Sequence, residues 1–506
     1  MKRISFLLIT VLSMTVSNAQ DITDALRYGT ENINGTARFN ALSGAFNALG
    51  GDVSSMAINP AGSAVFLTNS LSISLDIKDI ENNATYFNSR IRSFDADANL
   101  NQAGAVFVFN NADEESPWKK FTLGLNYIST NDFDNEVFSK GTGNTSIGSF
   151  FLAQAQGIPL DLLQLQGSET ISDLYTFLGE TQGTAAQNAF LGYQGFIFDP
   201  VDPTNSQNTQ YTSNIASGTF NQEYAHLTRG YNGKYTMNFA TQYNDNLFFG
   251  INLNTHIIDF DRYTYLYESN NNPGSVVTQV GFENNLSVLG SGFSAQIGAI
   301  LKVADNSRIS LSYDTPTWHV ISEETTQYLE TERVEEGVTI DQIVNPRVIN
   351  VFEDYNLRTP GKVAIGIAQV FGKKGLISFD YSYKDYANTE FSPKNDPFFI
   401  AENAFIRERL KDASTYRLGG EYRIDNLSLR GGVRYEESPY QDEVTVGDLS
   451  GFSLGVGYNF GNYTFDISYA RSEQSRSQQL YKVGLTDTVL IDTTQSNIVF
   501  TLGLNL

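Results

Sequence analysis

Residues 463–469 read Tyr-Thr-Phe-Asp-Ile-Ser-Tyr, so that large apolar and smaller polar side chains alternate with a period of two. Successive side chains of a β-strand point to opposite faces, and this pattern therefore predicts a strand with one apolar and one polar face. The same alternation recurs at residues 71–77, 121–127, 247–253 and 498–506. The chain is therefore expected to be all-β.

The length of these alternating stretches indicates a membrane barrel. A strand of a soluble sandwich usually has about five or six residues, whereas a transmembrane strand needs about 9–11, apolar toward lipid and polar toward the lumen. We count about 14 such strands over residues 68–506, joined alternately by short turns and longer loops. Closure into a barrel satisfies every main-chain polar group in the bilayer. The sequence thus predicts a transmembrane antiparallel β-barrel.

The composition excludes several other classes of protein. The 506 residues include no cysteine, and 33 basic residues face 56 acidic ones, which gives a formal net charge of -23. A nucleic-acid-binding face needs the opposite sign of charge, and a disulfide scaffold or a cysteine-ligated metal site needs cysteine. No nucleophile elbow, phosphate loop or metal-ligand motif appears. We therefore expect no catalytic residues, no metal, no cofactor and no nucleic-acid partner.

Residues 1–19 have the organisation of an export signal. Lys2 and Arg3 precede a short apolar run over residues 4–12, and small residues lead up to Ala19. This pattern is typical of a secretory signal peptide, and the apolar run is too short to remain as a membrane anchor. We therefore expect the barrel in the outer membrane of a Gram-negative bacterium. Outer-membrane lipid and, during biogenesis, the barrel-assembly machinery would be its partners.

Residues 20–67 precede the first strand and are rich in glycine and alanine. Small residues allow tight turns and close packing, and Pro60 fixes the backbone after Asn59. The lumen of a 14-strand barrel is wider than its own side chains can fill. We therefore interpret residues 20–67 as a plug, or hatch, in the lumen.

The hatch carries two motifs that resemble a known family. The stretch from Gly35 to Phe46 reads Gly-x-x-Arg-x-x-Ala-Leu-x-Gly-Ala-Phe, and Asn-Pro-Ala follows at residues 59–61. Both resemble the hatch of the FadL-type outer-membrane transporters of long-chain fatty acids and other hydrophobic compounds. The resemblance implies capture of the ligand on the outer loops, transfer into the barrel, and hatch-controlled exit sideways through a kinked third strand. The hatch-motif residues are Gly35, Arg38, Gly44, Phe46, Asn59, Pro60 and Ala61.

Residues 140–223 form a long, partly helical insertion after the third strand. An outer loop this long and this apolar should cover or bind something. The capture loops of the FadL-type family follow strands five and seven, so the insertion of this chain departs from that pattern. The candidate capture residues are Leu162, Leu163, Leu174, Phe177 and Leu178.

The alternation also places a group of charged residues on the lumen face of strands ten and eleven. Buried charges of both signs usually pair with one another, which predicts a structural network. The alternative is a site for a ligand carboxylate, because arginine binds carboxylates with two donors. The residues are Arg417, Glu421, Arg423, Arg430 and Arg434.

Gly124 and the histidines are open to a plain and a functional interpretation. Gly124 lies in the third strand, where a glycine permits a break but more often provides space in the lumen. The three histidines, at positions 226, 256 and 319, are far apart in sequence. We expect them to be ordinary lumen or loop residues.

The leading functional hypothesis is an uptake channel for hydrophobic small molecules, most simply long-chain fatty acids. One alternative is a general diffusion porin, in which residues 20–67 would be a flexible tail. Another is a surface-binding protein on a barrel scaffold, including a haemin-binding protein, with residues 140–223 as its binding module.

Overall fold

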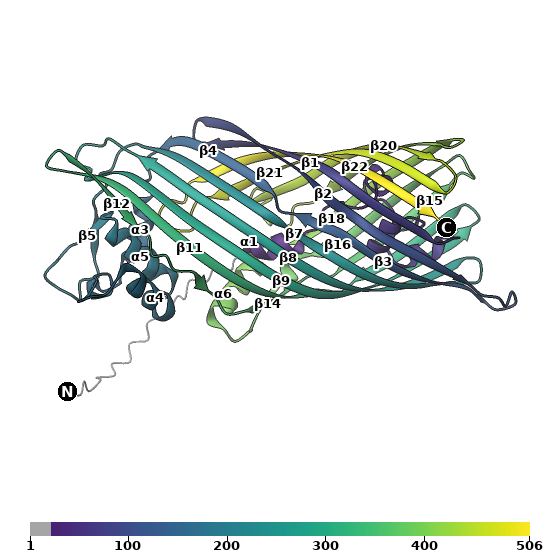
Figure 1. Cartoon of the computed structure of the whole chain (residues 1–506), viewed down its shortest axis with the longest axis horizontal. Helices are drawn as coiled ribbons and strands as arrows, with labels where there is room; N and C mark the ends of the chain where they lie inside the picture. Colours follow the sequence, from purple (N-terminus) through teal and green to yellow (C-terminus); the bar gives the residue numbers. More distant parts are fainter. Residues whose placement is uncertain (1–21) are drawn as a thin grey trace.

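The computed structural model describes residues 22–506, and the predicted export signal at residues 1–19 lies outside them. Within the described residues, one antiparallel sheet closes on itself. The closure is made by β1 (Ser70–Tyr86), which pairs with both β2 (Ser89–Asn110) and β22 (Thr488–Asn505). Some barrel strands consist of two or more segments, and the sheet is a 14-strand barrel (Figure 1). The predicted fold class is confirmed.

The third barrel strand comprises β3 and β4, the seventh comprises β10 and β11, and the eighth runs through β12 to β15. Short turns lie at the barrel end that carries the C-terminus, and long loops lie at the opposite end (Figure 1). The remaining barrel strands are β3 (Trp118–Asp132), β4 (Asn135–Gly143), β7 (Phe220–Tyr243), β8 (Leu247–Ser269), β9 (Val277–Ala304), β10 (Ser307–Asp314), β11 (Thr317–Glu335), β12 (Val338–Val344), β13 (Asn350–Val351), β14 (Tyr355–Thr359), β15 (Lys362–Val370), β16 (Gly375–Asp385), β17 (Glu390–Ser392), β18 (Asp412–Ile424), β19 (Leu427–Glu436), β20 (Val446–Asn459) and β21 (Tyr463–Gln479).

The period-two alternation appears as two faces of the wall. On β1, Leu71, Ile73 and Leu75 are exposed on the outside, whereas Ser74 and Asp76 are buried on the lumen side. An apolar outer face with a polar lumen face is what a lipid bilayer requires of a barrel. In the part of the chain that is described, no helix is long and apolar enough to cross a membrane.

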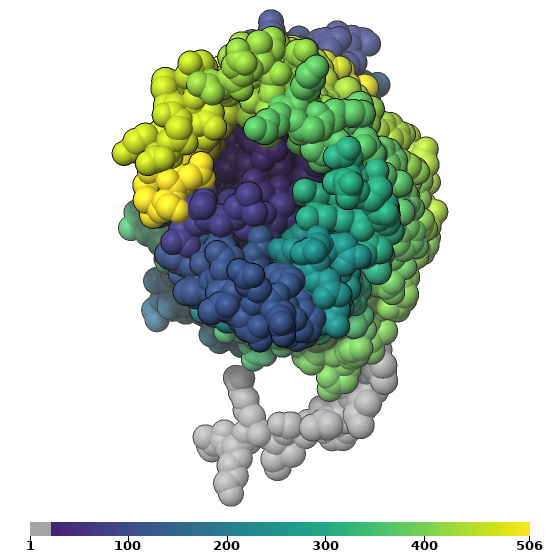
Figure 2. Space-filling view, turned by 90° about the vertical axis from the view of Figure 1, so that its right-hand side faces the viewer, coloured from purple at the N-terminus to yellow at the C-terminus, as the bar shows by residue number. Residues whose placement is uncertain are grey.

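The N-terminal segment, residues 22–66, lies inside the barrel. Helix α2 (Ala37–Ala41) packs on β19 to β22, and η2 (Pro60–Val65) packs on β3, β7, β8 and β9. Figure 2 views the barrel from the end with the short turns, and the N-terminal residues, in purple, fill much of its opening. This placement does not fit the flexible tail of the porin hypothesis. The elements of the segment are α1 (Ile22–Gly29), α2 (Ala37–Ala41), η1 (Val53–Ala57) and η2 (Pro60–Val65).

The insertion after the third strand is a small helical unit at the end with the long loops (Figure 1). It packs against the outward extensions of β9, β11 and β12, through Phe282, Leu329 and Val344. A second loop carries η4 (Tyr386–Asn388) and α6 (Pro397–Arg409). The elements of the insertion are α3 (Gly148–Ala155), η3 (Leu160–Leu162), α4 (Ile171–Thr181), α5 (Thr184–Gln194), β5 (Phe198–Pro200) and β6 (Tyr211–Ser213).

Candidate functional site

Glycines on the lumen face of the wall leave space for the N-terminal segment. A Cβ atom on Gly250 would lie 2.3 Å from the main-chain carbon of Pro60, and one on Gly298 would lie 2.0 Å from the side-chain oxygen of Asn59. Real Cβ atoms do not approach other atoms so closely. The wall and the segment are therefore complementary in shape, and strand glycines mark close backbone approach here.

The Asn59-Pro60-Ala61 motif anchors one part of the segment to this wall. This part lies toward the short turns, and we call it the lower end of the segment. The Asn59 side-chain oxygen accepts a hydrogen bond from Ala61 N at 3.0 Å, which caps η2. Its amide donates to Asn47 O at 2.9 Å and to Ala299 O at 3.3 Å. The Asn238 amide on β7 donates to Pro60 O at 2.9 Å. The motif thus fixes η2 to two different wall strands.

The other hatch-motif residues fix the turns around α2. Gly35 N donates to the Asn101 side-chain oxygen at 2.6 Å. Gly35 and Gly44 both have positive φ, at 148° and 74°, where a side chain would be strained. Phe46 is fully buried, and the Arg38 guanidinium lies 5.3 Å from its ring centre.

Three of the predicted lumen charges meet around one carboxylate. Glu421, which is fully buried, is 2.7 Å from Arg430 Nε and 2.6 Å from an Arg423 nitrogen. Arg38 of the N-terminal segment adds a third contact at 3.0 Å. We call these four residues the Glu421 cluster. It joins the segment to the wall by charge-assisted hydrogen bonds, which are stronger than neutral ones.

The other two predicted lumen arginines lie elsewhere. Arg434 is 3.3 Å from Glu436, and Arg417 is 3.8 Å from the same carboxylate oxygen. The five predicted residues therefore gather at Glu421 and at Glu436, with Arg430 also paired to Asp466, and do not form one continuous site.

The wall changes its bonding between β2 and the third barrel strand. The main-chain ladder between β2 and β3 runs from Asn110↔Lys120 to Gln102↔Ile128. Beyond that last pair, within residues 22–506, β2 pairs only with β1, and β4 pairs only with β7. Side chains bridge the two strands instead: Asn99 donates to Asp132 at 3.2 Å. We call this part of the wall, between residues 89–101 and 129–143, the seam.

The N-terminal segment covers the seam from the inside. Asn32 N donates to Thr130 O at 2.9 Å, and the Asn34 amide donates to Ser129 O at 2.6 Å. The Asn32 amide donates to the Asn131 side-chain oxygen at 2.6 Å. The segment therefore satisfies main-chain and side-chain groups that the missing ladder leaves open.

The irregularities of the third strand lie on either side of Gly124. Gly124 pairs regularly with both Val106 and Asn238, and its missing side chain makes room for Met56 of η1. The pairing with β7 shifts between Trp118 and Lys120 and between Ser129 and Asn131 instead. The interpretation of Gly124 as space in the lumen therefore fits the structure, and its interpretation as the position of the break is wrong.

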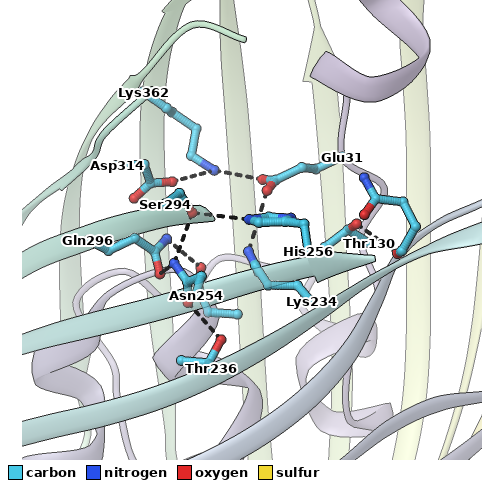
Figure 3. A network of polar contacts seen from close by, with 12 residues as sticks. Glu31, Thr130, Lys234, Thr236, Asn254, His256, Ser294, Gln296, Asp314 and Lys362 are labelled. Carbon is cyan, nitrogen blue, oxygen red and sulfur yellow. Dashed lines mark hydrogen bonds and ion pairs between the residues drawn. The ribbon is translucent and has the colours of Figure 1, made fainter. Parts of the chain in front are cut away.

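A second charge cluster holds the part of the segment that lies toward the long loops, which we call the upper end of the segment. Glu31 is 3.0 Å from Lys362 Nζ and 3.4 Å from Lys234 Nζ (Figure 3). Lys384 Nζ donates to the main chain at Gly29. Burial alone would raise the pKa of Glu31, but the charges of Lys234, Lys362 and Lys384 hold the pKa well below its usual range. We call Glu31 and the three lysines the Glu31 cluster. No local sequence pattern predicts this cluster, because its members come from four separate segments.

Two histidines lie beside this cluster. The rings of His256 and His319 are 5.7 Å apart, because both pair across β9 with Gly292, which has no side chain to separate them. His256 Nε2 is 3.0 Å from Ser294 Oγ (Figure 3). Within residues 22–506, Nδ1 of either ring has no hydrogen-bond partner. Their adjacency could not be anticipated from positions so distant in sequence.

Helix α1 lies in an apolar cluster on the long-loop side of the lysines. Ile258 on β8 and Ile321 on β11 lie two residues beyond the histidines, on the same strand faces. They are the first residues of this apolar lining. We call it the α1 cluster. Its members are Ile22, Ala25, Leu26 and Tyr28 of α1 with Phe133, Ile258, Phe260, Leu286, Val288, Ile321, Tyr355, Leu357, Phe391, Phe399, Ile406, Leu410 and Tyr440.

The candidate capture residues mostly hold the insertion together. Leu163, Leu174 and Leu178 are buried in its core, and Leu162 packs partly against it. Phe177 is the exception, since it is 46% exposed. Of the five, only Phe177 therefore presents a large apolar surface to a ligand from outside.

The family follows from comparison with known proteins. Residues 204–506 match the family described as "Outer membrane protein transport protein (OMPP1/FadL/TodX)". The chain belongs to this family. It is an outer-membrane channel for hydrophobic compounds in a Gram-negative bacterium, and it is a transport protein and not an enzyme. No curated protein matches the chain.

Solved structures share the fold over nearly the whole chain. A FadL homologue of Pseudomonas aeruginosa is 12% identical, with a TM-score of 0.53, and the match covers 94% of this chain and 98% of that one. The toluene transporter TodX of Pseudomonas putida is also 12% identical, with a TM-score of 0.51 and coverage of 94% and 99%. At such low identity the likeness concerns the fold alone.

Proposed function

We propose that this channel takes up long-chain fatty acids, captures them at its outer loops, and releases them sideways through the seam under control of the N-terminal segment. The seam is the observation that carries the proposal. It is a part of the wall where side chains replace the main-chain ladder, and Asn32 and Asn34 cover its end at residues 129–131 from within. Opening the seam requires side-chain bonds to break, whereas opening a ladder elsewhere would break several main-chain bonds at once.

The chemistry of the interior favours a carboxylate with a hydrocarbon chain. The Glu31 cluster supplies three ammonium groups, and the adjoining α1 cluster is lined with apolar and aromatic side chains. A ligand with a charged head and an apolar tail would use both regions. A neutral hydrocarbon such as toluene would leave the lysines without a role in recognition.

Equilibrium binding to the detergent-purified barrel tests the cargo. The probe is labelled oleate, with unlabelled oleate, haemin and toluene as competitors. Saturable binding displaced by oleate alone supports the proposal. Displacement by haemin or toluene overturns the fatty-acid assignment, and absence of saturable binding together with steady conductance in planar bilayers would favour a porin.

Cross-linking tests the seam as the exit. The chain has no cysteine, so Asn32→Cys with Asn131→Cys introduces a unique thiol pair at a contact of 2.6 Å. A short bifunctional thiol reagent should bind the segment to β3 and abolish oleate uptake by intact cells. The matched control is Thr142→Cys with Asn221→Cys, a contact of 2.8 Å within the regular β4–β7 ladder, which does not cross the seam. Uptake that survives the first cross-link contradicts passage through the seam.

A further inference from the structure

The N-terminal segment has the chemistry of an amphiphilic carboxylate. Its apolar part is α1, whose Ile22, Leu26 and Tyr28 are buried in the α1 cluster. Its anionic part is Glu31, whose carboxylate meets Lys362 at 3.0 Å and Lys234 at 3.4 Å. The hydrocarbon surface and the carboxylate thus occupy the two adjoining regions that a fatty acid would need.

The charges around Glu31 suit exchange of one carboxylate for another. The wall contributes Lys234, Lys362 and Lys384, and Asp314 lies 2.9 Å from Lys362 Nζ (Figure 3). With Glu31 and Asp314 both ionised, the group retains one positive charge. Removal of Glu31 without a replacement would leave three ammonium groups beside one carboxylate, that of Asp314. A second carboxylate restores the balance, whereas a neutral ligand does not.

Glu31 is directly connected to the residues that cover the seam. Asn32 follows it in the chain and donates to Thr130 O at 2.9 Å. The Asn131 amide returns a hydrogen bond to Thr30 O at 3.2 Å. A displacement of Glu31 that moves its main chain therefore disturbs the contacts between residues 30–34 and β3.

We propose that Glu31 and α1 occupy the substrate site as an internal surrogate, and that a fatty-acid carboxylate opens the seam by replacing Glu31 on Lys234 and Lys362. This inference rests on the proposed function and gives its gate a chemical trigger. It assigns the Glu31 cluster as a carboxylate-binding site that the chain itself fills in the closed state. It also makes the channel selective by charge, because a neutral molecule of the same length cannot replace Glu31.

The first test uses the Asn32→Cys, Asn131→Cys pair as a reporter of the closed state. Oleate should lower the initial rate of cross-linking by about tenfold or more, since a ligand shifts a two-state equilibrium by its differential affinity. Oleyl alcohol, which has the same chain without the charge, should leave the rate unchanged. An equal effect of oleate and oleyl alcohol, or no effect of oleate while it still binds, overturns the inference.

The second test removes the internal carboxylate. Glu31→Gln keeps the shape of the side chain and should lower the Kd for oleate by about tenfold, because the binding-competent state is then populated without competition. It should also slow cross-linking in the absence of ligand. The control is Glu114→Gln, in the exposed turn after β2. If the Glu31→Gln variant has the same Kd and the same cross-linking rate as the parent protein, the inference is overturned.

A third variant tests the inference at the lysines and includes a check that the barrel has folded. Lys234→Gln combined with Lys362→Gln should abolish the preference for oleate over oleyl alcohol, and heat-modifiable migration on gels reports whether the barrel has folded. An unchanged preference overturns the inference. Failure of the proposed function is distinguishable, because then the parent protein neither binds oleate saturably nor loses uptake when the seam is cross-linked.

Discussion

The two ends of the N-terminal segment are held to the wall in opposite ways. At the lower end the wall supplies the fully buried carboxylate of Glu421, and the segment supplies the cation, Arg38, which is 17% exposed. At the upper end the segment supplies the carboxylate, Glu31, which is 35% exposed, and the wall supplies lysines. A ligand carboxylate can take the place of Glu31, but none can take the place of Arg38. The N-terminal segment thus has one fixed end and one exchangeable end.

The shapes of the two ends agree with this division. The lower end fits against strand glycines such as Gly250 and Gly298, where no side chain could be added without displacing η2. The upper end meets the seam through side-chain and main-chain hydrogen bonds of Asn32 and Asn34. Tight packing resists rearrangement, whereas individual hydrogen bonds contribute about 1 kcal/mol each and exchange readily.

The largest expected effect comes from Glu421→Gln. It leaves Arg38 as a buried guanidinium without its carboxylate, and breaking a buried pair in this way costs about 3–5 kcal/mol. The urea midpoint of the folded barrel should fall, and a leak should appear in planar bilayers. The matched control is Glu473→Gln, whose exposed pair with Arg471 is worth about 1 kcal/mol or less. Equal effects of the two substitutions would contradict a fixed lower end.

Gly250→Ala should have the next largest effect. The added methyl group would lie 2.3 Å from the main chain of Pro60, and overpacking of this kind costs about 1–3 kcal/mol. Gly420→Ala is the control, since its Cβ atom would lie 3.7 Å from the nearest atom. Unfolding in urea measures both. If Gly250→Ala is tolerated as well as Gly420→Ala, the lower end is not held by shape.

Glu31→Gln should change stability less than Glu421→Gln does. A partly exposed pair contributes about 1 kcal/mol or less, so the urea midpoint should stay close to that of the parent. The effect on oleate affinity should nevertheless be large. A loss of stability as great as that of Glu421→Gln would show that the upper end is as fixed as the lower one.

Phe177→Ala should leave stability unchanged within about 0.5 kcal/mol, because the side chain is exposed on α4. If the insertion captures the ligand first, uptake at low oleate concentration should fall. Leu178→Ala, one residue further on the same helix, should instead destabilise the insertion by about 2–5 kcal/mol, measured as increased protease cleavage within residues 148–218. Unchanged uptake in Phe177→Ala would place first contact elsewhere.

Much of the barrel was predictable because its signal is local. The alternation at residues 463–469 reappears as β21, and the glycine-rich stretch before the first strand reappears inside the lumen. Each of these features depends on neighbours in the chain: side chains two apart on a strand share a face, and small residues allow tight turns. The division of Arg417 and Arg434 from the Glu421 cluster was not predictable, since it depends on which carboxylate each long side chain reaches.

The sequence by itself determined the class of the fold, the 14-strand barrel, the lumen segment with its Asn-Pro-Ala motif, and the family to which the chain belongs. Only the tertiary structure decided that Glu31 meets Lys234 and Lys362, that the ladder ends at Gln102↔Ile128, and that the leucines of the insertion face its own core. The physical reason is the range of the interactions. Periodicity and turn chemistry are set within a few residues, whereas register and charge pairing across a closed barrel join residues from tens to hundreds of positions apart.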